Sequence, residues 1–229
     1  MTKGRRQHAL WAVLVAALLG LTAAALWHGP TRRLSGSPGA AERPVVVAPG
    51  DGADALHDYG ALPAFGLVSQ TGDSVHLADL SGSVWVADFI FTHCAGTCPL
   101  MTAQLVRLQK SLAADAPIKL VSISVDPARD TPERLAEYAK GYGATADRWL
   151  FLTGDKAQIH RLSIDGFHLS VGDATPADLA AGAEPLMHST RLALVDGSGH
   201  VRGYYDGTKD ESVDELGAAV RKLIADSKP

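Results

Sequence analysis

Apolar and polar residues follow two distinct periodicities from about residue 58 onward. Val84–Phe91 (VWVADFIF) and Ile118–Val125 (IKLVSISV) are nearly continuous apolar runs of strand length, which is typical of central strands covered on both faces. Between them, Leu105, Leu108 and Leu112 recur with helical spacing. The pattern therefore predicts strands that alternate with helices.

Further elements continue this alternation to the C-terminus. Segment 64–79 predicts a hairpin, since Thr71–Gly72–Asp73 provides turn residues between two alternating arms. Thr131 and Pro132 supply the N-cap and first residue of a helix that extends to about Tyr142. The other predicted elements are a strand at Trp149–Leu152, a helix at Lys156–Ile164, a long connection at 166–187, a hairpin of Arg191–Val195 and Val201–Tyr205, and a helix at Glu211–Ala225. Together they predict an α/β sandwich with a mixed central sheet and a thioredoxin-like layout.

The first part of the chain carries a different signal. Ala9–Trp27 is an uncharged run of 19 residues. As a helix it is about 29 Å long, close to the ~30 Å hydrocarbon core of a bilayer, and a tryptophan lies near each end. The run predicts an uncleaved transmembrane anchor within residues 1–28. A cleaved signal peptide is the alternative, because three basic residues precede the run and Ala23–Ala25 offers small residues for cleavage.

Residues 29–57 are rich in glycine, proline and alanine and predict a flexible linker to a domain at residues 58–229. Five of the 21 Lys and Arg residues lie in residues 1–33, which contain no acid, so the rest of the chain has 16 basic and 25 acidic residues. We expect a single-pass protein of a bacterial-type cytoplasmic membrane whose C-terminal domain lies on the periplasmic side, where disulfide chemistry is possible. The acidic domain has no basic stripe with interleaved aromatic residues, which argues against nucleic acid as a partner.

Both cysteines of the chain, Cys94 and Cys98, lie in the segment FTHCAGTCPLM. They follow a buried strand and precede a helix, at the strand end where α/β sheets build sites. Pro99 fits the first helical position, so we expect Cys98 to be the N-cap, where the helix N-terminus favours thiolates of low pKa. The spacing allows a disulfide or the binding of one metal ion, with Cu(I) or zinc favoured by soft thiolates. A buried inert pair and a purely structural disulfide are the alternatives without a function.

A metal site needs at least one further ligand, and spacing alone does not select among the nine histidines. His93 adjoins Cys94 but points away from it if the strand continues. His168 opens the long connection, and His188 lies immediately before the first strand of the C-terminal hairpin. Asp126 ends the second buried strand near the same sheet edge, where it either orients a group of the site or serves as a loop and cap residue.

Three segments in order, FIFTHCAGTCPLM, VSISVDPARDTPERLAEYA and MHSTRLALVD, resemble the Sco/SenC copper-binding proteins of respiratory oxidase assembly. The resemblance covers roughly residues 60–225. It implies a thioredoxin-like fold in which Cys94, Cys98 and His188 bind copper, as Cu(I) or Cu(II). Family members often carry an aspartate between the cysteines, where this chain has Ala95–Gly96–Thr97. We expect that departure to change affinity or redox behaviour without removing a ligand.

The resemblance implies a membrane-tethered copper metallochaperone that helps assemble the dinuclear copper site of cytochrome c oxidase. Its expected partner is the copper-site subunit of that oxidase or another copper chaperone. The alternative is a thiol–disulfide oxidoreductase in which Cys94 and Cys98 are the redox pair that reduces cysteines of a partner protein. The C-x-x-x-C spacing and the absence of a proline immediately before the hairpin strand argue against a general thioredoxin. A peroxidase is a third alternative.

Overall fold

The computed structural model describes residues 56–113, 116–145, 147–173, 176, 180 and 186–227. The predicted membrane anchor at residues 1–28 and nearly all of the predicted linker lie outside these residues. Within the described part of the chain, no helix is both long enough and apolar enough to cross a bilayer.

One seven-stranded sheet forms the centre of the domain. Its strands are β1 (Gly66–Ser69), β2 (Ser74–His76), β3 (Val84–Ile90), β4 (Ile118–Ser124), β5 (Trp149–Thr153), β8 (Arg191–Val195) and β9 (Val201–Asp206), in the spatial order β2-β1-β5-β4-β3-β8-β9. The central strands β3, β4 and β5 are parallel, and every other pairing is antiparallel. The predicted mixed sheet and thioredoxin-like layout are therefore confirmed, including both hairpins.

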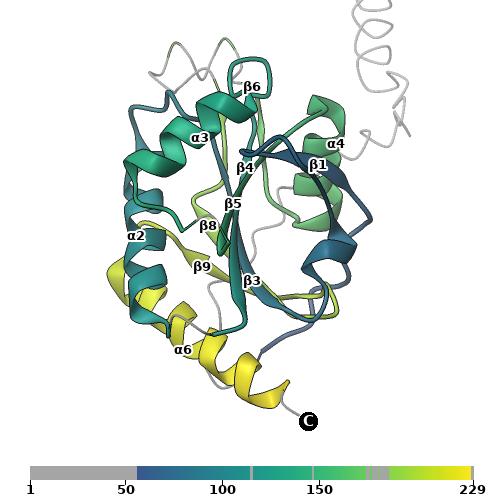
Figure 1. Ribbon diagram of the computed structural model, residues 1–229, viewed down its shortest axis with the longest axis vertical. Coiled ribbons are helices and arrows are strands. Elements are labelled where there is room, and N and C mark those ends of the chain that lie inside the picture. Colours follow the sequence, from purple (N-terminus) through teal and green to yellow (C-terminus); the bar gives the residue numbers. More distant parts are fainter. Residues whose placement is uncertain are drawn as a thin grey trace, which may run out of the picture. The chain divides into compact units, whose positions relative to one another are not determined.

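Helices cover both faces of the sheet. The helices α2 (Thr97–Ser111), α3 (Pro132–Gly141) and α6 (Asp210–Asp226) lie on one face, and α4 (Lys156–Arg161) lies on the other (Figure 1). A short 3-10 helix, η1 (Leu77–Leu80), follows β2. As predicted, α3 begins with Thr131 as its N-cap, whose hydroxyl accepts a hydrogen bond from the Arg134 amide, and with Pro132 in its first turn.

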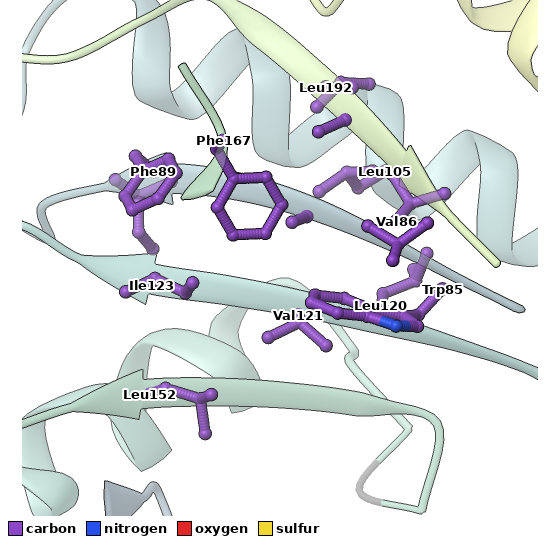
Figure 2. Close-up of a cluster of buried hydrophobic side chains, with 14 of the residues drawn as sticks. Trp85, Val86, Phe89, Leu105, Leu120, Val121, Ile123, Leu152, Phe167 and Leu192 are labelled. Atoms are coloured by element: carbon purple, nitrogen blue, oxygen red, sulfur yellow. The ribbon is translucent and has the colours of Figure 1, made fainter. Parts of the chain in front are cut away.

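The strand that leads to the cysteines is buried along its whole length, because it lies in the middle of the sheet with a layer on each side. Trp85 and Phe89 project to the α4 side, where each meets the ring of Phe167 edge to face, at centroid distances of 5.9 and 5.5 Å (Figure 2). Since side chains alternate along a strand, Val86 and Asp88 project to the opposite face, under α2 and α3. Both faces of β3 are thus part of the core.

Two predictions about the segment after β5 are corrected. The helix predicted at Lys156–Ile164 ends at Arg161 and continues as a π-helical turn, η2 (Leu162–Gly166). The connection predicted at 166–187 contains a two-stranded sheet of β6 (Gly172–Asp173) and β7 (Leu186–Met187), paired antiparallel. Strands of two residues are too short to produce a hydrophobic periodicity, so sequence patterning misses them.

Candidate metal centre

Cys94, Cys98 and His188 lie together in the folded chain. Their candidate ligand atoms, two sulfurs and an imidazole nitrogen, all lie within 4.8 Å of one another. The Nε2 atom of His188 is 2.9 Å from the Sγ atom of Cys98, although the two residues are 90 positions apart in the sequence. Both cysteines are free thiols. The structure thus brings together the three residues that the family resemblance singled out.

The two cysteines are placed by the junction between β3 and α2. Cys94 follows the strand, and its backbone amide donates to the Phe91 carbonyl at 3.2 Å. The helix begins at Thr97 with Gly96 as its N-cap, so the prediction that Cys98 is the N-cap is wrong. Glycine is well tolerated at a cap, and this choice moves Cys98 into the first helical turn, where it is fully buried.

His188 reaches the cysteines from the connection between β7 and β8. Its Nδ1 atom lies 3.0 Å from the Ser189 carbonyl oxygen, which can only accept a hydrogen bond. This contact places the proton on Nδ1 and leaves the Nε2 lone pair directed at the cysteines, as a metal ligand requires. Burial lowers the pKa of His188, so its imidazole is neutral at neutral pH. The ring edge also packs on Phe91 at 5.5 Å.

The electrostatics of Cys98 differ from expectation. Burial raises the pKa of this thiol well above its ordinary value, and the neighbouring Cys94 and the Asp88 carboxyl raise it further. The prediction of a low pKa from the helix N-terminus is therefore wrong for Cys98, because desolvation of the thiolate outweighs the helix dipole. Without a metal ion this residue holds its proton, whereas a bound cation stabilises the thiolate directly.

Two acids from the turn after β4 hold the segment just before Cys94. Asp130 is fully buried and accepts hydrogen bonds from the Thr92 amide at 3.1 Å, the Thr92 hydroxyl at 2.6 Å and the Ser124 hydroxyl at 2.5 Å. Asp126 lies 3.6 Å from His93 and forms an ion pair with Arg129. Sequence reasoning named Asp126 but missed Asp130, whose only signal was its place directly before the α3 cap.

The other histidines of the described segments do not join the cluster. His93 lies 3.6 Å from Asp126, and β3 ends at Ile90, so the strand that would direct His93 away from Cys94 does not reach it. His168 is exposed and has a positive φ of 51° after the π-helical turn. The candidate centre therefore offers one imidazole and two sulfurs, all from residues that are buried or half-buried.

Comparisons with known proteins identify the family of this chain. The family model described as SCO1/SenC matches residues 54–225. The SCO1 protein homolog of Bacillus subtilis (strain 168) is 35% identical over 154 residues, which are 66% of this chain and 77% of that protein. A putative copper-binding protein of Stutzerimonas stutzeri is 35% identical over 147 residues, covering 63% of this chain and 68% of that protein.

A solved structure shows the same arrangement of the chain. BsSco, a member of the Sco family of cytochrome c oxidase assembly proteins in which a disulfide switch was identified, superposes with a TM-score of 0.63. It is 32% identical, and the match covers 74% of this chain and 96% of BsSco.

Proposed function

The chain belongs to the SCO1/SenC family, and on this premise we propose that it is a copper metallochaperone that holds its cargo through Cys94, Cys98 and His188. It delivers copper to the dinuclear copper site of cytochrome c oxidase. The observation that carries the proposal is the convergence of two sulfurs and one imidazole nitrogen within 4.8 Å.

The donor set suits copper better than the other common metals. Thiolates and imidazole bind soft or borderline ions such as copper and zinc, and exclude calcium and magnesium, which need oxygen ligands. Structural zinc sites close around four ligands, whereas the group found in the described residues has three. A relative that matches at 35% identity is named as a putative copper-binding protein, which supports the same choice.

Anaerobic titration of the reduced full chain with Cu(I), against a competing chelator, tests this function. We expect one equivalent to bind tightly and this binding to be lost in Cys94→Ser. His160→Ala, which removes a histidine outside the cluster, is the matched control and keeps wild-type affinity. Binding no tighter than that of an ordinary exposed dithiol, in the wild-type chain, contradicts the proposal.

A thiol–disulfide oxidoreductase is the second candidate function. The two sulfurs lie close enough to approach one another, and the relative BsSco has a disulfide switch. In this reaction the dithiol of Cys94 and Cys98 loses two electrons and two protons, and a partner's disulfide gains them to become two thiols. Cys94 is 9% exposed and Cys98 is 0% exposed, so the partner meets Cys94 first. The reduced pair binds copper and the oxidised pair does not, so both functions are compatible.

The location of the domain is part of the proposal and is supported by the sequence alone. Ala9–Trp27 tethers the chain to a bacterial-type cytoplasmic membrane, with the domain on the periplasmic side, facing the copper-site subunit of the oxidase or another copper chaperone. Protease treatment of spheroplasts tests this topology. The domain is expected to be digested while a cytoplasmic control protein survives, and a protected domain contradicts it.

A further inference from the structure

Asp88 is a buried carboxyl that the proposed copper chemistry does not use. It lies in β3, six residues before Cys94, and its side chain is 0% exposed. Neither carboxylate oxygen accepts a well-formed hydrogen bond, and the Ser122 hydroxyl on the paired strand β4 only partly favours its charged form. Burying such a group without well-formed hydrogen bonds costs free energy, so its presence in a strand that is otherwise apolar calls for an explanation.

The carboxyl lies on the same side of the sheet as Cys98. Trp85 and Phe89 of the same strand contact Phe167 on the α4 side, so Asp88 faces α2 and α3. Its negative charge acts on groups of both helices, because it raises the pKa of Cys98 on α2 and of Tyr138 on α3, in each case after the larger effect of burial. The negative charge of an ionised Asp88 therefore acts on Cys98, one of the candidate ligands.

We propose that Asp88 controls the oxidation state of copper at Cys94, Cys98 and His188, its negative charge favouring Cu(II) over Cu(I). The inference rests on the copper function proposed above. Two thiolates and a neutral imidazole give the site no net charge with Cu(II) and one negative charge with Cu(I). A nearby carboxylate opposes the added negative charge, and inside the protein this repulsion is weakly screened.

The control operates near neutral pH. Burial raises the pKa of Asp88 to about 7, against an opposing effect of the Ser122 hydroxyl on β4. The titratable groups on which the charge of Asp88 acts are Cys98 of α2 and Tyr138 of α3, and the high pKa of Tyr138 keeps its phenol neutral in this range. The neighbouring strand β8 presents buried apolar residues here. Asp88 is thus a group whose charge changes around pH 7.

Reduction of the site and protonation of Asp88 are coupled. One electron, supplied by a dissolved one-electron mediator, converts Cu(II) to Cu(I), and one proton from water converts the Asp88 carboxylate to the acid. No bond to copper is made or broken in this step. By linkage, a proton on Asp88 favours Cu(I) and Cu(I) favours the proton. The midpoint potential of the bound copper therefore falls as pH rises from 6 to 8.

Mediated spectroelectrochemistry of the copper-loaded full chain tests the proposal, with wild type and Asp88→Asn compared from pH 5.5 to 8.5. At pH 8 we expect Asp88→Asn to raise the ratio of Cu(I) to Cu(II) affinity at least tenfold, or about 59 mV for a one-electron couple. The variant also loses the pH dependence between 6 and 8. Asp165→Asn, an exposed acid of η2, is the matched control and behaves as wild type.

The outcomes of this experiment distinguish failure of the Asp88 proposal from failure of the proposed copper function. The proposal is overturned if the Asp88→Asn chain binds one copper ion with the wild-type ratio of Cu(I) to Cu(II) affinity and the wild-type pH dependence of the midpoint potential. If the introduced amide prevents folding, Asp88→Ser is used in place of Asp88→Asn. If the wild-type chain binds no copper, the proposed function fails by itself. The pH profile of alkylation of the metal-free thiols then decides whether the Asp88 charge reaches them: faster alkylation at pH 8 in Asp88→Asn supports it, and an unchanged profile refutes it.

Discussion

The β3–α2 junction, which carries Cys94 and Cys98, and the β6–β7 arm, which carries His188, are held by different kinds of contact. We define the arm as residues 169–173 and 186–188. The junction follows a strand buried at all seven positions and paired in parallel with β4 over its full length. Among its described residues, the arm is paired over only two residues and has an exposed Lys156–Asp173 ion pair at 3.1 Å, and its Leu169, Val171 and Leu186 side chains are buried.

This difference separates two requirements of a metal carrier. The sulfurs, which supply the strongest bonds to a soft ion, are fixed by the core and by the buried Asp130. The imidazole comes from a segment outside the seven-stranded sheet whose described strands pair over two residues, so we expect it to detach more easily than the sulfurs. On the proposed function, we expect such a site to hold its ion through the sulfurs and to release it when a partner replaces the imidazole.

We expect the largest effects from substituting one candidate ligand in the β3–α2 junction and one in the arm. Cys98→Ser removes a ligand fixed by the core and abolishes Cu(I) binding together with disulfide formation. His188→Ala removes the ligand of the arm, and we expect loss of tight copper binding while disulfide exchange is largely retained. Chelator competition and a dithiol–disulfide exchange assay measure the two properties. Unchanged copper affinity in His188→Ala takes this residue out of the site.

The buried carboxyl of β3 makes the rigid half of the site sensitive to pH. The pKa of Asp88 is raised from 3.8 to about 7 in the folded chain, so folding favours its protonated form. Its contribution is fully favourable below about pH 4 and is lost as pH rises through about 7, a change of about 4 kcal/mol in the free energy of unfolding. Urea unfolding from pH 4 to 8.5 measures it, and Asp88→Asn removes this dependence. Equal slopes in both chains contradict the prediction.

Asp130→Ala weakens the support of the cysteines directly. The substitution leaves the Thr92 amide and hydroxyl and the Ser124 hydroxyl without their acceptor in a buried place. We expect the free energy of unfolding to fall by about 3 kcal/mol, together with a weaker affinity for Cu(I). Denaturant unfolding checks the first effect, with Asp165→Ala as the surface control. A loss of less than about 1 kcal/mol means that water replaces the missing acceptor.

The smallest effect belongs to the ion pair of the arm. Lys156 and Asp173 have side chains that are 56% and 70% exposed, so Lys156→Ala is expected to change the free energy of unfolding by no more than about 0.5 kcal/mol. The same change is expected to accelerate transfer of Cu(I) to a chelator, because the arm opens more easily. Stopped-flow transfer kinetics measure this rate. A rate equal to that of wild type shows that the pair does not restrain His188.

The fold and the cysteine pair could be predicted from sequence because they leave strong local signals. Continuous apolar runs identify β3 and β4, and a Cys-x-x-x-Cys segment between a strand and a helix indicates a site. Local signals did not select His188, which came from family resemblance, since its partner is 90 residues away. The raised pKa values of Cys98 and Asp88 depend on burial in three dimensions. No window of sequence contains that information.

The distance in sequence between Cys98 and His188 has a consequence for the lifetime of the protein. An ion that binds both residues cross-links two points 90 positions apart, and an unfolded chain cannot hold it in the same way. Copper binding therefore raises the free energy of unfolding. The increase grows with the logarithm of the ratio between the free copper concentration and the dissociation constant. On the proposed function, we expect the copper-loaded chain to resist unfolding and proteolysis better than the empty chain.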